Sequence, residues 1–416
     1  MPLRMWVLVL NAGSSSLKFA LIETERGTRP CEGAIDALDS ARPSTLTFQH
    51  AGQASSQQLD LTGHAEALAR VAHCLQGPLE ALSARGEGTL EAVAHRVVHG
   101  GERFREAVRI DAAVEEALEA LSSLAPLHNP PALAGIRAAV QAFGDLPQVA
   151  VFDTAFHQSL PPLAYRYAVP EAWYRDLGVR KYGFHGTSVR FVSESMAVLS
   201  PLARRLIVAH LGNGCSLTAV ADGKSCDTTM GLTPLAGVVM GTRCGDIDPG
   251  LTAYLARRGV DVKDVDHALN HASGLFALSG GESDVRELEA QALAGEGQAR
   301  FALEVFADRV AKAVASLTVS LGGLDALCFA GGIGEHGSAM RTRIVARLAF
   351  LGLQLDASLN AARVSRAMRI DQRPATQNLG ANVAGGGGAE IWVVPTDEAV
   401  MIAKEAAQVL NCSARG

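Results

Sequence analysis

The sequence has little of several features that mark other classes of protein. Only 5% of its 416 residues are aromatic, 19% are charged, and the formal net charge is −6. The negative balance argues against a nucleic-acid-binding surface. The seven cysteines form no C-x-x-C pair and no even set, which argues against a disulfide framework and favours reduced thiols in a cytoplasmic protein.

Long apolar runs are also missing. Every long uncharged stretch is broken by Gly, Asn, His or Pro, so we expect no membrane span. The apolar run Met5–Leu10 stops at Asn11 and is too short for a signal peptide. The sequence contains no P-loop, no protein-kinase catalytic loop, no G-x-S-x-G elbow and no H-E-x-x-H spacing for zinc.

A hairpin pattern near the start of the chain occurs a second time about 200 residues later. Residues Val7–Ile22 read as an apolar run, a Gly/Ser turn and a second apolar run. Leu206–Val220 has the same form, with Ser216-Leu217 in the place of Ser16-Leu17. A third Gly-rich turn follows the apolar run that starts at Ala326. Glycines let backbone N–H groups approach an anionic oxygen closely. The pattern predicts two similar domains that hold one polyphosphate, with two ordinary tight hairpins as the alternative.

The length of the chain is typical of two domains rather than one core. Strand-like runs alternate with helical periodicity, which favours an α/β fold with parallel-rich sheets covered on both faces. We expect helices at 64–85, 112–124, 251–258, 299–321 and 396–410. We expect strands at 92–99, 149–152, 206–210, 217–221 and 326–329, with loops at 227–250 and 365–390.

Four clusters combine glycine with a residue that could carry chemistry. Arg96 ends a strand-like run beside a glycine pair, and Asp153 follows the buried run that ends at Phe152. Ligands of α/β folds bind where strands end in this way. His185 lies between glycines, and Arg243 shares a Gly-rich loop with two carboxylates.

Each cluster also has a purely structural interpretation. An arginine and an aspartate in loops more often form a structural ion pair than a catalytic one. A histidine in a glycine turn is more often exposed than catalytic. We expect His95, His99 and His157 to be local hydrogen-bonding groups.

Together these segments closely resemble the acetate kinase family over nearly the whole chain. The segments that carry the resemblance are Asn11-Ala-Gly-Ser-Ser-Ser-Leu-Lys18, His95-Arg-Val-Val-His-Gly-Gly-Glu102, Leu124-Ala-Pro-Leu-His-Asn-Pro-Pro131, Phe152-Asp-Thr-Ala-Phe-His157, Tyr182-Gly-Phe-His-Gly-Thr-Ser188, Ala209-His-Leu-Gly-Asn-Gly214, and Met240-Gly-Thr-Arg243 with Gly245-Asp-Ile-Asp-Pro249. One short motif would be weak, but seven in order are specific.

The resemblance implies an α/β fold of two duplicated actin-like (RNase H-like) domains with ATP in the cleft between them. The domains expected are 1–152, 153–396 and a last helix, 397–416, that returns to the first domain. The activity implied is reversible transfer of the γ-phosphoryl group of ATP to acetate, or to propionate or another short-chain carboxylate. Mg²⁺ or Mn²⁺ is the implied cofactor, and a cytoplasmic homodimer without nucleic-acid or membrane partners is the implied state.

The resemblance also assigns residues. The implied catalytic residues are Arg96, Asp153, His185 and Arg243. The implied acyl pocket consists of Arg96, Val98, Leu127, Phe184 and Pro234. The implied nucleotide site consists of Lys18, His210, Gly212, Asn213, Gly214, Asp284, Val285, Arg286, Gly331, Gly332, Ile333 and Gly334. The implied metal-linked residues are Asn11 and Glu398.

Three positions depart from the family pattern. Val189 stands where the family usually has a second histidine, a position that we expect to support the catalytic histidine. Val285 replaces a phenylalanine and His336 an asparagine, and we expect these changes to bear on nucleotide preference. The catalytic set is complete, so we expect a working enzyme.

Two other functions, both from other classes of protein, remain as alternative hypotheses. A non-catalytic nucleotide-binding or filament-forming protein of the actin-like superfamily should lack Arg96, His185 and Arg243, and all three are present. A transcriptional regulator on the same scaffold should carry a basic DNA-binding module, and we expect none because the first hairpin begins at once.

Overall fold

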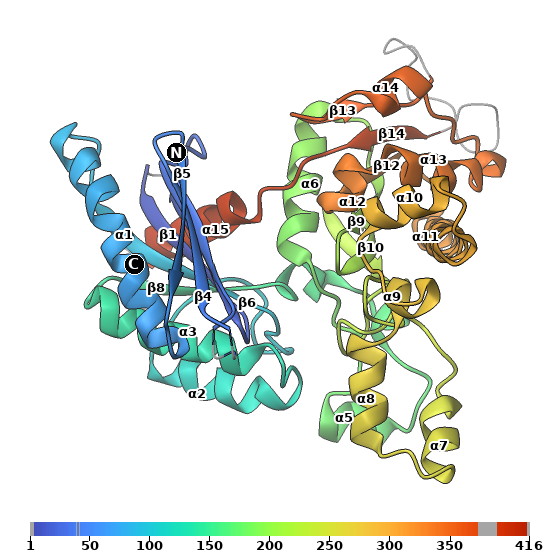
Figure 1. Cartoon of the computed structure of the whole chain (residues 1–416), viewed down its shortest axis with the longest axis horizontal. Helices are drawn as coiled ribbons and strands as arrows, with labels where there is room; N and C mark the ends of the chain where they lie inside the picture. The colour runs from blue at the N-terminus through green and yellow to red at the C-terminus, as the bar shows by residue number, and fades with distance from the viewer. Residues whose placement is uncertain (1–3, 39, 41, 373–388, 414–416) are drawn as a thin grey trace. The chain divides into compact units, whose positions relative to one another are not determined.

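The computed structural model describes residues 4–38, 40, 42–372 and 389–413, and the chain divides into two compact units. The first unit comprises Met1–Phe156 together with Asp397–Gly416, and the second comprises His157–Thr396. Each unit is built on a sheet that helices cover (Figure 1). The predicted α/β class is therefore confirmed.

Within the described residues, the first unit holds an eight-stranded sheet in the order β5-β4-β3-β2-β1-β6-β8-β7. Its strands are β1 (Trp6–Ala12), β2 (Ser16–Glu23), β3 (Cys31–Asp36), β4 (Ser44–His50), β5 (Gln53–Leu59), β6 (Leu90–Val97), β7 (Val108–Arg109) and β8 (Gln148–Phe152). Its helices are α1 (Gly63–Ala84), α2 (Ala112–Ala120), the 3₁₀ turn η1 (Leu121–Ser123), α3 (Asn129–Phe143) and α15 (Glu398–Ser413).

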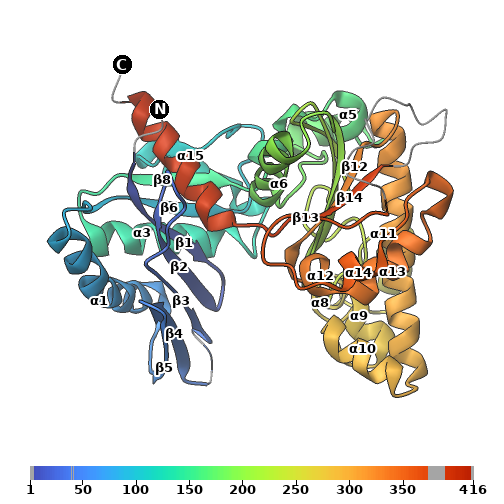
Figure 2. The same ribbon diagram turned by 90° about the horizontal axis from the view of Figure 1, so that it is seen from above.

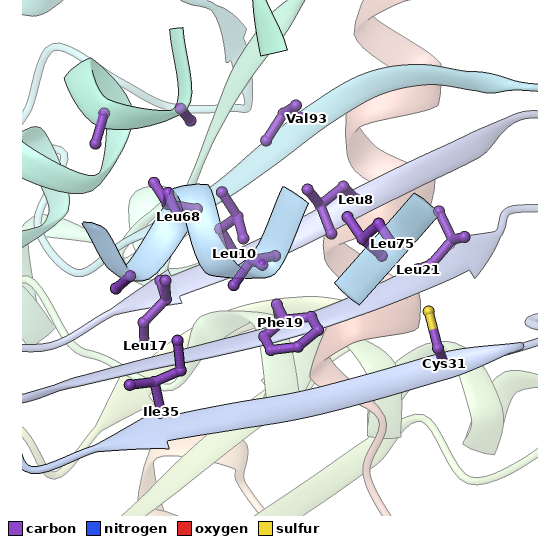
Figure 3. Packing of buried hydrophobic residues seen from close by; sticks show 14 of the residues in the cluster. Leu8, Leu10, Leu17, Phe19, Leu21, Cys31, Ile35, Leu68, Leu75 and Val93 are labelled. Carbon is purple, nitrogen blue, oxygen red and sulfur yellow. The ribbon is translucent and has the colours of Figure 1, made fainter. Parts of the chain in front are cut away.

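Helices cover both faces of this sheet, α1 and α3 on one side and α15 on the other (Figure 2). Leu8, Leu10 and Leu17 point from β1 and β2 toward Leu68 and Leu75 of α1 (Figure 3). Since each of these side chains is fully or almost fully buried, each contributes about 1.5–3 kcal/mol of hydrophobic stabilisation.

The opposite face of the sheet packs against α15. Alternate strand residues point to opposite faces, so Val7 and Val9 of β1 turn away from α1 and contact the buried residues Val400 and Ala403 of α15. The helix from the end of the chain thus forms part of the core of the first unit.

The second unit holds, within the described residues, a six-stranded sheet in the order β11-β10-β9-β12-β14-β13. Its strands are β9 (Arg205–Leu211), β10 (Cys215–Ala221), β11 (Lys224–Thr228), β12 (Ala326–Ala330), β13 (Met368–Arg369) and β14 (Glu390–Val393). The long helix α11 (Gly297–Leu321) packs on β9, β10 and β11 through one buried stripe that includes Phe306, Val310 and Val314.

The other helical segments connect the strands of this unit. They are η2 (Ala155–Ser159), α4 (Pro162–Tyr165), α5 (Glu171–Leu177), α6 (Gly186–Leu199), α7 (Gly250–Arg257), α8 (Val262–His271), α9 (Gly274–Ser279), α10 (Val285–Leu293), α11 (Gly297–Leu321), α12 (Gly331–His336), α13 (Ser338–Ala346), η3 (Ala349–Leu351) and α14 (Ala357–Ala361).

The two sheets share one strand plan. In each, an antiparallel hairpin (β1-β2, β9-β10) pairs with a third antiparallel strand (β3, β11) on one side. On the other side it pairs with a parallel strand (β6, β12), then a second parallel strand (β8, β14) and an antiparallel edge strand (β7, β13). The predicted duplication is confirmed at the level of topology.

The register of the repeat differs from the sequence match. Leu17 pairs with Ala12, the last residue of β1, whereas Leu217 pairs with Ala209, two residues before the end of β9. Ser16-Leu17 and Ser216-Leu217 therefore occupy different rungs of their hairpins, because the second turn is shorter.

Several predicted elements need correction. The helix predicted at 112–124 is α-helical only to Ala120, after which the chain tightens into η1. The last helix begins at Glu398, two residues later than predicted. The Gly-rich turn after β12 is the first turn of a helix, α12. The flexible loop predicted at Gly385–Gly388 lies outside the described residues.

No helix among the described residues is both long enough and apolar enough to cross a membrane.

Candidate functional site

In the first unit, four predicted site residues lie on the α15 side of the sheet at one end of its strands. Asn11 of β1 pairs with Lys18 of β2 in the ladder, and both continue the alternation of the residues that pack on α15. Arg96 occupies the same face of β6, and Asp153 follows the end of the neighbouring β8. Parallel strands of an α/β sheet place ligand-binding residues at this edge.

Arg96 and Asp153 form a close two-point ion pair. The guanidinium donates from Nε to Oδ1 at 2.9 Å and from Nη2 to Oδ2 at 2.5 Å. Its Nε also lies 3.9 Å from Oε2 of Glu398, in the first turn of α15. Burial acts to lower the pKa of Arg96, but the carboxylates of Asp153 and Glu398 raise it above its ordinary value. Burial raises the pKa of Asp153, and the charge of Arg96 opposes that rise. Arg96 is therefore a permanent cation in a fixed orientation.

Asn11, Lys18, Arg96 and Glu398 line a hollow of about 710 Å³ on this face of the sheet. No cluster of three or more His, Cys, Asp or Glu side chains that could enclose a metal occurs among the described residues. Mg²⁺ does not require such a cage, since it keeps several waters and binds through one or two carboxylates together with substrate phosphates. The carboxylate of Glu398 and the amide oxygen of Asn11 are hard oxygen ligands of this kind, so the residues present fit Mg²⁺.

In the second unit, His185 is held in an uncommon backbone conformation. It precedes α6 with a φ of 58°, in the left-handed region, which is sparsely populated by residues other than glycine. Its Nδ1 lies 2.9 Å from Oγ of Ser216 on β10. A Cβ atom on Gly214 would lie 3.5 Å from both Nε2 of His185 and Nη2 of Arg243. The structure thus brings His185, Arg243 and the turn after β9 together.

The loop that carries Arg243 is fixed by its backbone. The N–H groups of Leu275 and Phe276, in α9, donate to the carbonyl oxygens of Met240 and Gly241 at 2.9 Å each. The side chain of Asn213 lies close to Gly241, since a Cβ on that glycine would lie 2.1 Å from its Oδ1. Arg243 itself donates from Nη1 to the carbonyl oxygen of Pro234 at 3.0 Å. The guanidinium is thereby oriented by the protein before any ligand binds.

The two predicted nucleotide turns lie against each other. Gly331 has a φ of +74°, and a Cβ there would lie 2.7 Å from the carbonyl oxygen of Leu211, which begins the turn Gly212–Gly214. Only glycine allows this approach. Oε1 of Glu335 accepts hydrogen bonds from the N–H of Gly331 at 3.1 Å and from the N–H of Thr396 at 3.2 Å. The backbone N–H of Gly331, the first of the four predicted residues Gly331 to Gly334, is therefore already hydrogen-bonded within the protein.

His210 and the segment Asp284–Arg286 complete the predicted nucleotide residues. The rings of His210 and His185 stack with centroids 4.4 Å apart. Asp284 begins α10, and its carboxylate accepts from the backbone N–H and the guanidinium of Arg286. These hydrogen bonds lower the pKa of Asp284 to about 2. Val285, the first residue of α10, is buried.

The predicted acyl-pocket residues differ in exposure. Val98 and Pro234 are half-buried, Phe184 is buried, and Leu127 is 49% exposed. Val98 belongs to the first unit with Leu127, and Pro234 belongs to the second with Phe184. In each unit, an apolar side chain therefore lies within a few residues of a site arginine or histidine in the sequence.

Three other histidines hydrogen-bond locally, as predicted. Nε2 of His95 lies 2.8 Å from Oε1 of Gln148, and Nδ1 of His99 accepts from the N–H of Gly101 at 3.0 Å. Nε2 of His157 donates to the carbonyl oxygen of Phe184 at 2.9 Å, which supports the segment that presents His185.

Buried histidines should make stability depend on pH. Burial lowers the pKa of His95 and His157 to about 4 from 6.5. Between these values the unfolded chain binds more protons than the folded chain, so stability falls as the pH drops from about 6.5 to about 4. Each histidine should contribute a slope of about 1.4 kcal/mol per pH unit. Denaturation at several pH values should show a flatter slope for His95→Gln, and an unchanged slope would contradict the assignment.

The sequence analysis did not identify the residues whose side chains hydrogen-bond with the predicted site residues. Ser216 and Ser188 bind the two site histidines, and Glu335 binds the backbone of Gly331. No spacing in the sequence signals these contacts, since Ser216 is separated from His185 by 31 positions.

Known proteins resemble this chain over nearly its full length. The profile of the Acetokinase family matches residues 6–404. The chain is 47% identical over 411 residues to an acetate kinase of Deinococcus radiodurans, with 98% of each protein covered. It is 45% identical over 408 residues to an acetate kinase of Chromobacterium violaceum, with 97% of this chain and 98% of that protein covered.

Two solved structures are similar over nearly their full length. A propionate kinase from Francisella tularensis superposes with a TM-score of 0.86 at 40% identity, covering 96% of this chain and 98% of that one. An acetate kinase from Porphyromonas gingivalis superposes with a TM-score of 0.85 at 35% identity, covering 98% of this chain and 100% of that one.

Proposed function

Because the chain belongs to the acetokinase family, we propose that it transfers the γ-phosphoryl group of ATP reversibly to acetate, giving acetyl phosphate and ADP. One observation carries this proposal in the second unit: a histidine ring nitrogen and a guanidinium, those of His185 and Arg243, converge on the glycine turn after β9. Such a set suits an anionic phosphoryl group rather than a neutral substrate.

The chemistry explains why the proposed site has cations but needs no general base. Acetate is ionised at neutral pH, so its oxygen can attack the γ-phosphorus directly, with ADP as the leaving group. The main barrier is bringing two anions together and stabilising the charge on the three equatorial oxygens of the transferring phosphoryl group. Fixed donors achieve this without reorganising during the reaction.

In the first unit, we assign Arg96 to the acetate carboxylate. Asp153 holds the guanidinium through two hydrogen bonds, so the cation keeps its orientation when the substrate enters or leaves. Val98 and Leu127 provide apolar surface for the methyl group. Lys18, exposed on β2 next to Asn11 in the ladder, supplies a further cation for the polyphosphate.

In the second unit, we assign Arg243 and His185 to the oxygens of the transferring phosphoryl group. Nε2 of His185 donates to one of these oxygens, and the guanidinium of Arg243 binds another. In the turns Gly212–Gly214 and Gly331–Gly334, the N–H groups of Gly212 and Gly331 are engaged within the protein, and those of the residues that follow them are offered to the other phosphates. His210 and the segment Asp284–Arg286 contribute the remaining contacts with the nucleotide.

Glu398 and Asn11 are the proposed residues for Mg²⁺. When bound, the ion neutralises phosphate charge and aligns the β- and γ-phosphates. Glu398 is held near Arg96 at the start of α15, with Oε2 of its carboxylate 3.9 Å from Nε of the guanidinium. A cytoplasmic homodimer is part of the same proposal, and sedimentation of the purified protein would test its oligomeric state.

An assay with several acids tests the proposed function. Purified protein, ATP and Mg²⁺ are incubated with acetate, propionate or butyrate, and the acyl phosphate is trapped with hydroxylamine. We expect an acyl hydroxamate with acetate as the preferred acid. Binding of ATP without a trapped product from any acid would overturn the proposal.

A propionate kinase is the second candidate, because the similar structure from Francisella tularensis is a propionate kinase. Acetate and propionate differ by one methylene group, which a hydrophobic pocket separates by only about 10–200-fold. The ratio of kcat/KM for the two acids in the assay above decides between the candidates.

Enlarging the proposed pocket should shift this ratio. Val98→Ala removes two methyl groups and should raise kcat/KM for propionate relative to acetate by roughly tenfold. Leu163→Ala, at a side chain that is 96% exposed in the second unit, is the control and should leave the ratio unchanged. An unaltered ratio in Val98→Ala would remove Val98 from the pocket.

A further inference from the structure

Two buried serines hold two histidines of the second unit, His185 and His210, in the same way. Oγ of Ser216 lies 2.9 Å from Nδ1 of His185, and Oγ of Ser188 lies 2.7 Å from Nδ1 of His210. Neither serine is exposed to solvent. The two imidazole rings stack with centroids 4.4 Å apart and planes inclined by 33°. In both rings, Nδ1 is the nitrogen that forms a hydrogen bond with a serine hydroxyl.

The strand register explains how Ser216 reaches His185. Ser216 lies directly opposite His210 in the β9-β10 ladder, and side chains of directly opposed residues share a face of the sheet. His185, at the start of α6, therefore stacks on one member of this pair and hydrogen-bonds with the other. Its other ring nitrogen, Nε2, lies beside Gly214 and Nη2 of Arg243.

The direction of the Ser216 hydrogen bond decides where the imidazole proton lies. Within the part of the chain that the structure describes, the hydroxyl of Ser216 has one hydrogen-bond partner, Nδ1 of His185. If the hydroxyl accepted from Nδ1–H, its own hydrogen would be buried without an acceptor, which is unfavourable. The favourable arrangement has the hydroxyl donate to Nδ1, and the neutral ring then carries its proton on Nε2.

We propose that Ser216 is a positioning residue that holds His185 in the tautomer with the proton on Nε2, ready to donate to the transferring phosphoryl group. The proposal rests on the proposed function, because it assumes that His185 acts on that group. It also accounts for a departure in this sequence. Residue 189 is a buried valine without a polar side-chain atom, so its side chain cannot hydrogen-bond with the ring as Ser216 of β10 does.

Two variants of nearly equal shape separate the hydroxyl from the packing. Ser216→Thr keeps the hydroxyl and Ser216→Val replaces it with a methyl group. We expect Ser216→Val to lower kcat roughly tenfold, which corresponds to one hydrogen bond, with little change in the KM for acetate. Ser216→Thr should retain most of the activity. Should the larger side chains prevent folding, Ser216→Ala serves as the variant without the hydroxyl.

Nitrogen NMR of isotope-labelled histidine provides a readout that does not depend on activity. In the wild type and in Ser216→Thr, Nδ1 of His185 should give the signal of an unprotonated nitrogen and Nε2 that of a protonated one. In Ser216→Val the two signals should move toward a mixture of tautomers. Equal losses of kcat in both variants with an unchanged tautomer would show a packing effect and overturn the proposal. A wild type with the expected tautomer but no acyl phosphate would instead refute the proposed function.

Discussion

Arg243→Ala should lower kcat by about 10³-fold, the loss typical of an arginine that stabilises a phosphoryl-transfer transition state. The guanidinium is preorganised by its hydrogen bond to the carbonyl oxygen of Pro234 and lies beside Nε2 of His185. Because the charge on the equatorial oxygens develops in the transition state, kcat and kcat/KM for ATP should fall by similar factors. Steady-state kinetics measures both quantities.

Two further variants sharpen this result. Arg243→Lys keeps the charge but loses the planar fork of donors, so it should recover only part of the activity. Arg204→Ala removes an exposed arginine of the same unit, one that pairs with Asp222 at the surface, and should leave kcat unchanged. A rise in KM with an unchanged kcat in Arg243→Ala would show that this residue only binds substrate.

Asp153→Ala should lower the free energy of unfolding by about 3–5 kcal/mol, because it leaves the charge of Arg96 without its main partner. Asp153 is 1% exposed, and it accepts two hydrogen bonds from the guanidinium. Urea denaturation of the wild type and the variant measures the difference. The same variant should also lose activity, since Arg96 is no longer held in position.

A double replacement separates the lost charge pair from the lost packing. Arg96→Met combined with Asp153→Leu removes both charges and should recover most of the stability, though not the activity. Glu119→Ala breaks a surface pair with Arg137 and should leave the free energy of unfolding nearly unchanged. A double variant as unstable as Asp153→Ala would show that packing, not the unpaired charge, causes the loss.

The sequence predicted the elements whose patterns are local. The hairpins are examples, because apolar runs on both sides of a glycine turn favour two neighbouring strands. The helix predicted at 64–85 is α1, Gly63–Ala84, because its apolar residues recur with the helical period. Arg96 and Asp153 were predicted to bind a ligand because each lies at the end of an apolar run, and the structure places both at the same end of the first sheet.

Other elements gave no local signal. β5 consists of Gln53–Leu59, in which six of the seven residues are exposed, so no alternation marks it as a strand. It is a strand because β4 pairs along its whole length. The glycines of α12 favour a turn, yet the chain there is helical and Glu335 binds its first amide. Tertiary contacts decide both cases.

The hydrogen bonds that hold the site histidines join residues far apart in the chain, so no sequence spacing predicts them. Ser216 was recognised only as a turn residue of the second hairpin, whereas the structure places its hydroxyl on His185. A hydrogen bond between two segments can be read only after the sheet is assembled. The sequence therefore indicated which groups are candidates for the chemistry, and the structure adds which side chains hydrogen-bond with them.

The central claim is that an acetate oxygen forms the new bond to the phosphoryl group that ATP gives up. The measurement that tests it most directly is phosphorus NMR of the products formed from ATP, Mg²⁺ and acetate labelled with a heavy oxygen isotope in both carboxylate positions. The account predicts an acetyl phosphate signal with the isotope shift of a heavy bridging oxygen. Only unlabelled inorganic phosphate, or an acetyl phosphate without the shift, would contradict it.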